Sequence, residues 1–238
     1  MNSLPFKFTS GPNKKLSIVL LVFTAFYLTL LGPIVLFGCN YFGIDDANYI
    51  NFIFYAIATV ATVAMCFSVL KEDYNSFVTH PFFCILTVLG CFLIAKMLDS
   101  FVNILVFFLM DGNMENLNNN EVMAEYGTKS TGAIRATALF LAPIAEELMF
   151  RVGVFGTARR FFKKSWPAYI IGVVIFSLYH VAAYAFEDPS YLYMGLLYIP
   201  VSFALCFCYE RTNSVWASIL LHFVNNAIAL GVLSSGLI

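Results

Sequence analysis

The sequence predicts an all-α protein, a polytopic integral membrane helix bundle of about seven transmembrane helices, with six to eight as the range. Two observations predict this fold. The 238 residues are 61% hydrophobic and only 11% charged, with a mean hydropathy of +0.82, far outside the range of soluble domains. Apolar stretches of the roughly 20 residues that are needed to cross a bilayer core also recur along the whole chain.

The expected spans follow one another with mostly short connections. They are residues 16–38, 49–70, 81–110, 133–155, 166–186, 191–209 and 215–233. The first is longer than the apolar core of a signal peptide and lacks an A-x-A cleavage site, so we expect it to be retained. The third is long for an upright helix, which predicts that it is tilted, broken or extended beyond the membrane.

The chain divides into two parts on this pattern. Residues 1–132 hold the first three transmembrane helices and a long loop, residues 111–132, that is rich in Asn and Glu. Residues 133–238 hold helices four to seven, which carry the polar motifs described below.

The basic residues indicate the orientation. With a cytoplasmic N-terminus, the inside segments hold Lys7, Lys14, Lys15, Lys71, Arg159, Arg160, Lys163, Lys164 and Arg211. The outside segments hold only Lys129 and, at the edge of a span, Arg135. Short cytoplasmic loops carry an excess of Lys and Arg, so we expect a multi-pass protein of the cell membrane. Its N-terminus would be cytoplasmic, and the 111–132 loop and the C-terminus outside.

Charge and cysteine content exclude other classes. The net charge is −1 and the pI is about 6.3, so no nucleic-acid partner is expected. The six cysteines lie mostly within apolar runs and show neither a disulfide framework nor the spacing of a zinc site. No cofactor or metal is expected.

Ionisable side chains inside the expected spans are the most informative feature of the sequence. Such residues are costly in a bilayer and by default face the bundle interior and serve a function. They are Lys96, Asp99, Glu146, Glu147, Arg151, His180 and His222. Lys96 and Asp99, three residues apart, indicate a local ion pair of undetermined role.

The fourth span contains the run PIAEELMFR. Glu147 and Arg151 are four residues apart in the favourable order for an ion pair on one helix face. Glu146 points about 100° away around the helix and needs partners from other helices. Pro143, about one turn earlier, favours a kink or a small polar opening beside Glu146.

Spans five and seven supply those partners. His180 follows Phe176 by four residues, and His222 precedes Asn226 by four, which places each pair on one helix face. Counted from the cytoplasmic ends, Glu146, His180, His222 and Asn226 lie about 11 to 21 Å deep at 1.5 Å per residue. Three separate helices therefore place polar groups in one slab near the middle of the membrane.

Polar side chains can also serve as interhelical glue, each contact contributing on the order of 1 kcal/mol. We apply this structural interpretation to Glu147 with Arg151, because each neutralises the other. Contacts that only hold helices together do not require two imidazoles and a carboxylate at the same depth in the membrane. We therefore interpret Glu146, His180, His222 and Asn226 as a functional cluster.

Together these residues resemble a known family. E-E-x-x-x-R at Glu146, Glu147 and Arg151, F-x-x-x-H at Phe176 and His180, and H-x-x-x-N at His222 and Asn226 are similar to the three motifs of the CPBP family. This family includes CAAX-type prenyl endopeptidases and bacterial Abi-type bacteriocin-processing and self-immunity proteins. The resemblance covers spans four to seven.

The resemblance implies a glutamate-dependent intramembrane endopeptidase with its active site buried in the bundle. Carried over by residue, Glu146 activates a water molecule, His180 assists it, and His222 and Asn226 stabilise the oxyanion. Glu147, Arg151 and Phe176 would have supporting roles. The implied partners are a peptide or protein substrate and the lipid bilayer, while the substrate's identity, any prenylation and a processing or immunity role stay open.

Other functions remain as alternatives. A metallo-endopeptidase is less favoured because no H-E-x-x-H motif is present. A protease with a serine or cysteine nucleophile is also less favoured, because no Ser or Cys is paired by spacing with either His. A non-proteolytic binding, immunity or regulatory protein on the same fold would be indicated by degraded motifs, whereas all three are intact. A proton-coupled transporter would be indicated by broken helices and inverted repeats.

Overall fold

The computed structural model describes residues 8–110, 131–162 and 164–234, and every regular element in these segments is helical. In order they are α1 (Lys14–Phe26), π-helical η1 (Tyr27–Leu31), α2 (Gly32–Tyr41), α3 (Ala47–Thr79), α4 (Pro81–Leu109), α6 (Thr131–Ala136), π-helical η2 (Thr137–Leu141), α7 (Ala142–Glu146), π-helical η3 (Glu147–Gly156), α8 (Thr157–Phe161), α9 (Trp166–Glu187), 3₁₀-helical η4 (Pro189–Tyr198), α10 (Ile199–Thr212) and α11 (Val215–Ser234). The predicted all-α membrane bundle is confirmed.

Helices occupy all seven positions where spans were expected. Five stretches are long and apolar enough to cross a membrane: Lys14–Tyr41, Ala47–Thr79, Pro81–Leu109, Trp166–Glu187 and Pro189–Thr212. Val215–Gly231 is a shorter apolar helix. The expected fourth span lies within residues 131–161, a stretch with three charged side chains at its centre. Apart from its last two residues, which begin α6, the predicted 111–132 loop lies outside the described residues.

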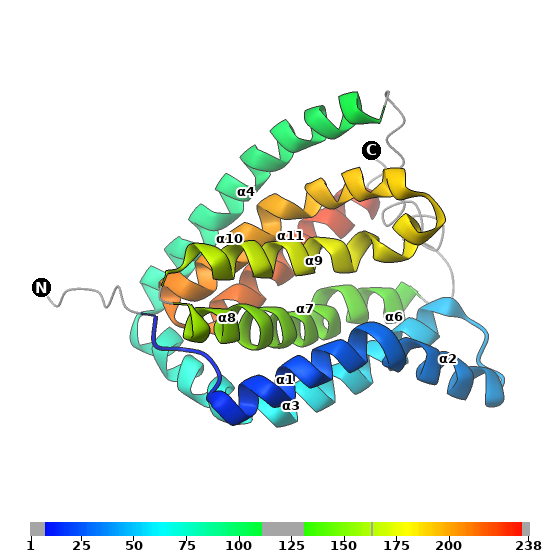
Figure 1. The fold of residues 1–238 in the computed structure, drawn as a ribbon, viewed down its shortest axis with the longest axis horizontal. Helices are drawn as coiled ribbons and strands as arrows, with labels where there is room; N and C mark the ends of the chain where they lie inside the picture. Colours follow the sequence, from blue (N-terminus) through cyan, green and yellow to red (C-terminus); the bar gives the residue numbers. More distant parts are fainter. Residues whose placement is uncertain (1–7, 111–130, 163, 235–238) are drawn as a thin grey trace, which may run out of the picture.

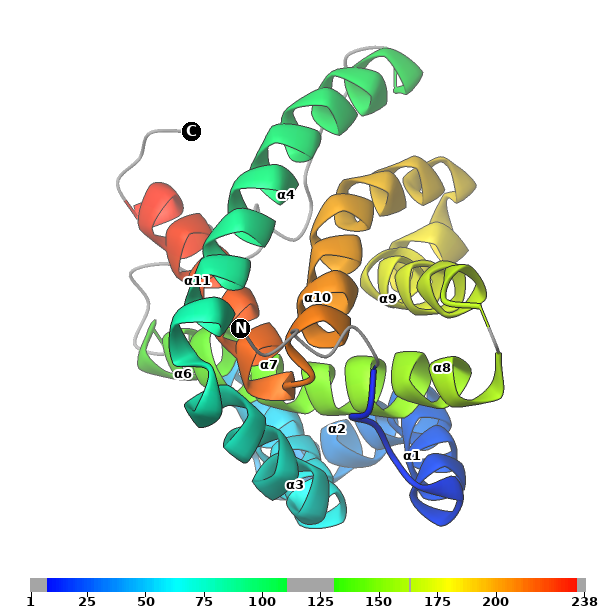
Figure 2. The same ribbon diagram turned by 90° about the vertical axis from the view of Figure 1, so that its left-hand side faces the viewer.

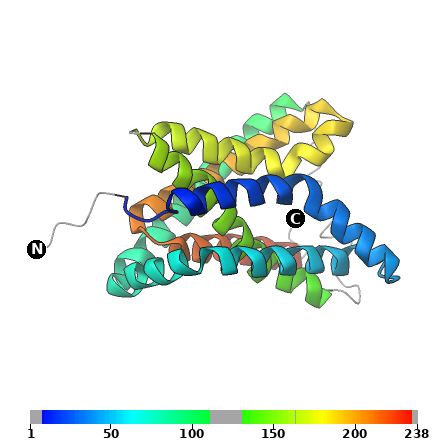
Figure 3. The same ribbon diagram turned by 60° about the horizontal axis from the view of Figure 1, so that its bottom comes forward.

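The stretch from α6 to α8 runs through the middle of the bundle (Figure 1). It is packed between two groups of helices, with α1 and α3 on one side and α9, α10 and α11 on the other (Figures 1 and 2). Figure 3 shows α1 and α3 running side by side. All ten residues of η3 are buried, as expected of a helix that is enclosed on every side.

The third expected span is a single unbroken helix, α4. It runs obliquely to the other long helices (Figures 1 and 2), and of the three expected forms the broken one is therefore wrong. It packs mainly against α10, α11 and η4 and makes few contacts with α3.

Glycine lets the central helix approach its neighbours closely. A Cβ atom at Gly153 would lie 3.3 Å from the Cβ of Leu20 in α1. One at Gly156 would lie 3.0 Å from the Cδ of Pro12. Small residues at such contacts allow helices in a membrane to pack backbone against backbone.

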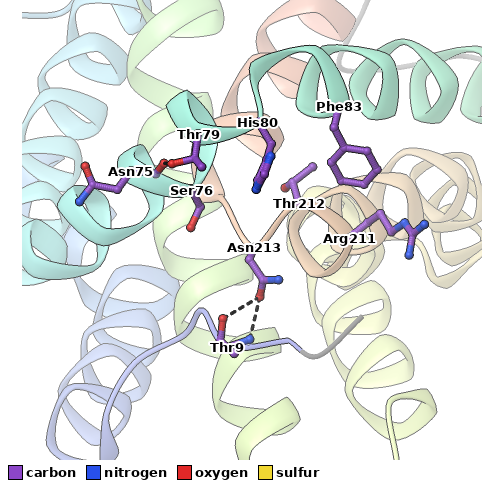
Figure 4. Close-up of a pocket in the computed structure, with 9 residues that line it drawn as sticks. All are labelled: Thr9, Asn75, Ser76, Thr79, His80, Phe83, Arg211, Thr212 and Asn213. Carbon is purple, nitrogen blue, oxygen red and sulfur yellow. Dashed lines mark hydrogen bonds between the residues drawn. The ribbon is translucent and has the colours of Figure 1, made fainter. Parts of the chain in front are cut away.

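Residues 8–13, here called the N-terminal strap, close one end of the bundle. The main-chain N–H groups of Thr9 and Ser10 donate to Asn213 Oδ1 at 2.7 and 3.2 Å. Asn213 has a left-handed backbone with φ of 51° that ends α10. Thr9 and Asn213 also line a cavity of about 290 Å³ between the ends of α3, α4 and α10 (Figure 4).

The buried side chain of Asp73 in α3 joins the strap to the last helix. Ser10 Oγ donates to both carboxylate oxygens at 2.7 and 2.9 Å. The N–H of Val215, the first residue of α11, donates to Asp73 Oδ2 at 2.9 Å. A carboxylate at this position caps the helix and complements the positive end of its dipole.

We expect Asp73→Ala to lower the free energy of unfolding by about 2 to 4 kcal/mol, because it leaves buried donors on two segments without an acceptor. Thermal unfolding in detergent measures the change. Glu72→Ala is the matched control, since Glu72 is exposed on the same helix turn. Equal unfolding temperatures for the two variants would contradict the capping role.

Candidate active site

The four predicted site residues line one cavity of about 420 Å³ inside the bundle. Glu146 comes from α7, His180 from α9, and His222 and Asn226 from α11. The other lining residues are Asn51, Tyr55, Lys96, Asp99, Asn103, Thr137, Ala138, Ala142, Phe176, Leu197, Tyr198, Val201, Asn225, Ala229 and Leu230. The expectation that the four polar residues meet in one place agrees with this arrangement, although no hydrogen bond joins them directly.

The carboxylate of Glu146 has two different oxygen environments. Tyr55 of α3 donates its hydroxyl to Oε1 at 2.8 Å. Oε2 lies 3.9 Å from Nε2 of His222, too far for a hydrogen bond, and has no hydrogen-bond partner among the described residues. The side chain is 4% exposed, so this unpartnered oxygen is a buried polar atom that requires an explanation.

Sequence analysis missed the tyrosines that hold Glu146. The hydroxyl of Tyr55 also bonds that of Tyr179 at 2.9 Å, and Tyr179 in turn bonds Tyr27. All three tyrosines lie within predicted apolar spans. A buried Tyr hydroxyl needs a hydrogen-bond partner, so their presence there was the signal in the sequence for a polar contact between helices. Tyr27 and Tyr55 belong to the N-terminal part of the chain, which therefore contributes to the site.

Glu147 has other partners in addition to Arg151, which is the partner expected from the sequence. The imidazole of His222 donates from Nδ1 to Glu147 Oε1 at 2.8 Å. Ser218, one turn earlier on α11, donates its hydroxyl to Oε2 at 2.6 Å. These bonds direct the other ring nitrogen of His222, Nε2, toward Glu146. Ser218 was not predicted.

The predicted ion pair between Glu147 and Arg151 is present. Arg151 Nε lies 3.0 Å from Glu147 Oε2, and both side chains are fully buried. The N–H groups of Arg151 are not aligned for hydrogen bonds. The guanidinium instead lies over the ring of Phe176, 4.3 Å from its centroid, which is a cation–π contact.

His180 is held by a hydrogen bond to the backbone of Phe176 and by stacking on the ring of Tyr198. Its Nδ1 lies 2.8 Å from the carbonyl oxygen of Phe176, so Nδ1 carries the hydrogen and Nε2 is left as an acceptor. The imidazole stacks on Tyr198 with ring centroids 4.4 Å apart.

Asn226 is held by two hydrogen bonds. Its Nδ2 donates to the carbonyl oxygen of Ala138 at 2.9 Å, and Oδ1 accepts from Asn225 at 3.3 Å. An NH₂ group has two donors, and the described residues provide an acceptor for only one of them. Pro143, where a kink or a small polar opening was expected, lies in α7 between two π-helical segments, η2 and η3.

The fold and the cavity define a class: multi-pass membrane proteins whose helix bundle holds a Glu and two His around an internal cavity. Residues 130–228 match the family model described as type II CAAX prenyl endopeptidase Rce1-like. This match confirms the resemblance to the CPBP family over that part of the chain.

One curated relative extends the comparison. The chain is similar to the UPF0177 protein YbdI of Lactococcus lactis subsp. lactis (strain IL1403), at 33% identity over 91 residues. The aligned region covers 38% of this chain and 43% of that protein. No solved structure matches the chain significantly.

We expect Glu147→Gln to destabilise the fold by about 3 to 5 kcal/mol, because it leaves the buried charge of Arg151 without a counterion. Chemical unfolding in detergent, followed by circular dichroism, measures this loss. Glu187→Gln, an exposed position at the end of α9, is the control. If Glu147→Gln unfolds like the control, the ion pair does not support the bundle.

Proposed function

We propose that the protein is an intramembrane endopeptidase that hydrolyses peptide bonds of membrane-associated or secreted peptides by water activated at Glu146. The observation that carries the proposal is the buried Oε2 of Glu146. Within the part of the chain that the structure describes, this oxygen has no hydrogen-bond partner, and its side chain lines the same cavity as two imidazoles and an amide. A free carboxylate oxygen there can take a proton from water.

In the proposed reaction, water donates one hydrogen bond to Glu146 Oε2 and the other to His180 Nε2. As the water oxygen attacks the peptide carbonyl carbon, its proton passes to Glu146. That proton is then delivered to the amine nitrogen while the C–N bond breaks, leaving a carboxyl group and an amine. The backbone bond to Phe176 keeps Nε2 of His180 as the acceptor.

His222 and Asn226 would stabilise the developing oxyanion. The role requires a proton on Nε2 of His222 and uses the second N–H of Asn226. Each well-placed donor contributes about 3 kcal/mol in a dry site. Glu147 acts through His222 in this scheme, since it holds Nδ1 and so sets the direction of Nε2.

No step of this scheme uses a metal. Within residues 8–110, 131–162 and 164–234, no three His, Cys, Asp or Glu side chains form a group that could hold a metal ion.

We expect Glu146→Gln to lower peptide cleavage by about 10² or more, because the amide keeps the size of the side chain but cannot accept the proton. Mass spectrometry of secreted and membrane peptides from cells with the wild-type protein or the variant detects the lost cleavage. Glu187→Gln serves as the control, and wild-type cleavage is expected to persist with a metal chelator.

A binding or immunity protein on the same fold predicts a different result. Its activity would survive Glu146→Gln, because the site would do no proton chemistry. Full restoration of a deletion strain's phenotype by the variant would therefore overturn the protease proposal.

We further propose that the N-terminus and residues 159–164 are cytoplasmic, on the Lys and Arg asymmetry. All six native cysteines are free and buried, so a membrane-impermeant maleimide reports on an introduced one. We expect labelling of intact cells at Asp45→Cys and none at Arg160→Cys until the membrane is opened. The reverse pattern would contradict the orientation.

A further inference from the structure

The cavity has a second polar wall, on α4. Lys96, Asp99 and Asn103 follow one another at intervals of three and four residues, and all three line the cavity that Glu146 lines. This spacing places them on one face of the helix. The rest of the helix is strongly apolar, with large exposed side chains such as Phe101 and Ile104.

The ammonium of Lys96 uses only part of its bonding capacity. Nζ lies 2.9 Å from Oδ2 of Asp99, and the side chain is 41% exposed. It also lies 5.8 Å from the centroid of Phe92. An ammonium has three donors, and Asp99 is the only hydrogen-bond acceptor that the described residues give it.

Stability does not account for the pair. A partly exposed ion pair contributes about 0 to 1 kcal/mol, whereas moving two charges into a membrane interior costs several kcal/mol per ion. Two apolar residues would suit a spanning helix better. The pair is therefore better explained by what the cavity binds.

We propose that Lys96 binds a carboxylate of the peptide substrate, either its C-terminal group or an acidic side chain. An N–H of the ammonium would donate to the carboxylate oxygen, and such charge-assisted bonds are roughly twice as strong as neutral ones. Asp99 positions the ammonium by its bond to Nζ. The proposal rests on the proposed protease function and adds the chemical class of the group that selects the substrate.

The charges of the cavity restrict where the carboxylate lies. Asp99 and Glu146 also line the cavity and repel an anion, so the favourable position is on the side of Lys96 away from both. A volume of about 420 Å³ is at the small end for ligand sites. Lys96 and Glu146 line this one cavity, so the bound carboxylate belongs to the part of the peptide that enters the cavity with the bond that is cut.

The test measures binding rather than cleavage. Full-length Glu146→Gln protein in detergent is titrated with a fluorescently labelled, short apolar peptide, and anisotropy is read. One pair of peptides differs in a free or amidated C-terminus, and a second pair in an internal Glu or Gln. We expect about tenfold tighter binding of the carboxylate form in one pair, and which pair responds identifies the source of the carboxylate.

Lys96→Met is expected to remove this preference and Lys96→Arg to keep it. Lys15→Met, an exposed lysine at the start of α1, is the matched control and leaves the preference unchanged. Lys96→Met alone leaves the charge of Asp99 unpaired, and this charge would repel a peptide carboxylate. The double variant Lys96→Met with Asp99→Asn removes both charges. Recovery of the preference for the carboxylate peptide in the double variant would show that its loss in Lys96→Met came from the unpaired Asp99.

Equal binding of acid and amide peptides, or a preference that survives Lys96→Met, overturns the inference. Recovery of the preference for the carboxylate peptide in the double variant also overturns the inference. A Lys96-dependent preference without Glu146-dependent cleavage in the wild-type protein supports the carboxylate site and overturns the protease function, so the two failures are distinguishable.

Discussion

The centre of the bundle depends on the buried carboxylate of Glu147. It is paired with Arg151 on its own helix and receives hydrogen bonds from Ser218 and His222 on α11. Charges removed from water at a cost of several kcal/mol per ion persist only when their partners are in place. The position of α11 against the central helix is therefore fixed by chemistry as well as by packing, and the same bonds direct His222 toward Glu146.

Two adjacent glutamates thus have opposite roles. Glu147 has both carboxylate oxygens engaged, Oε1 by His222 and Oε2 by Ser218 and Arg151. Glu146, the last residue of α7, is held through one oxygen by Tyr55, and its other oxygen has no hydrogen-bond partner among the residues that the structure describes. The tyrosine comes from α3, so the N-terminal helices support the reactive group as well as enclosing it.

Much of this could be predicted from the sequence. Hydropathy placed helices at all seven positions, and the spacing of charged residues predicted the Glu147–Arg151 and Lys96–Asp99 pairs, because contacts within one helix follow from its period. Contacts between helices could not be derived in this way. The Tyr55, Ser218 and Asp73 bonds depend on how helices rotate against one another, which no local period records. Their residue types are also common in spans without such roles.

The N-terminal strap has a consequence for the order of assembly. Thr9 bonds to Asn213, a residue 204 positions later, and Ser10 binds an aspartate that also caps the start of the last helix. Chains emerge from the ribosome N-terminus first, so the strap is made long before its acceptor Asn213 is in the membrane. Closing so long a loop is also entropically costly until the intervening helices are inserted. The bonds that join the strap to Asn213, and the Asp73 cap of α11, can therefore form only after α10 and α11 have been inserted. Their formation marks completed folding.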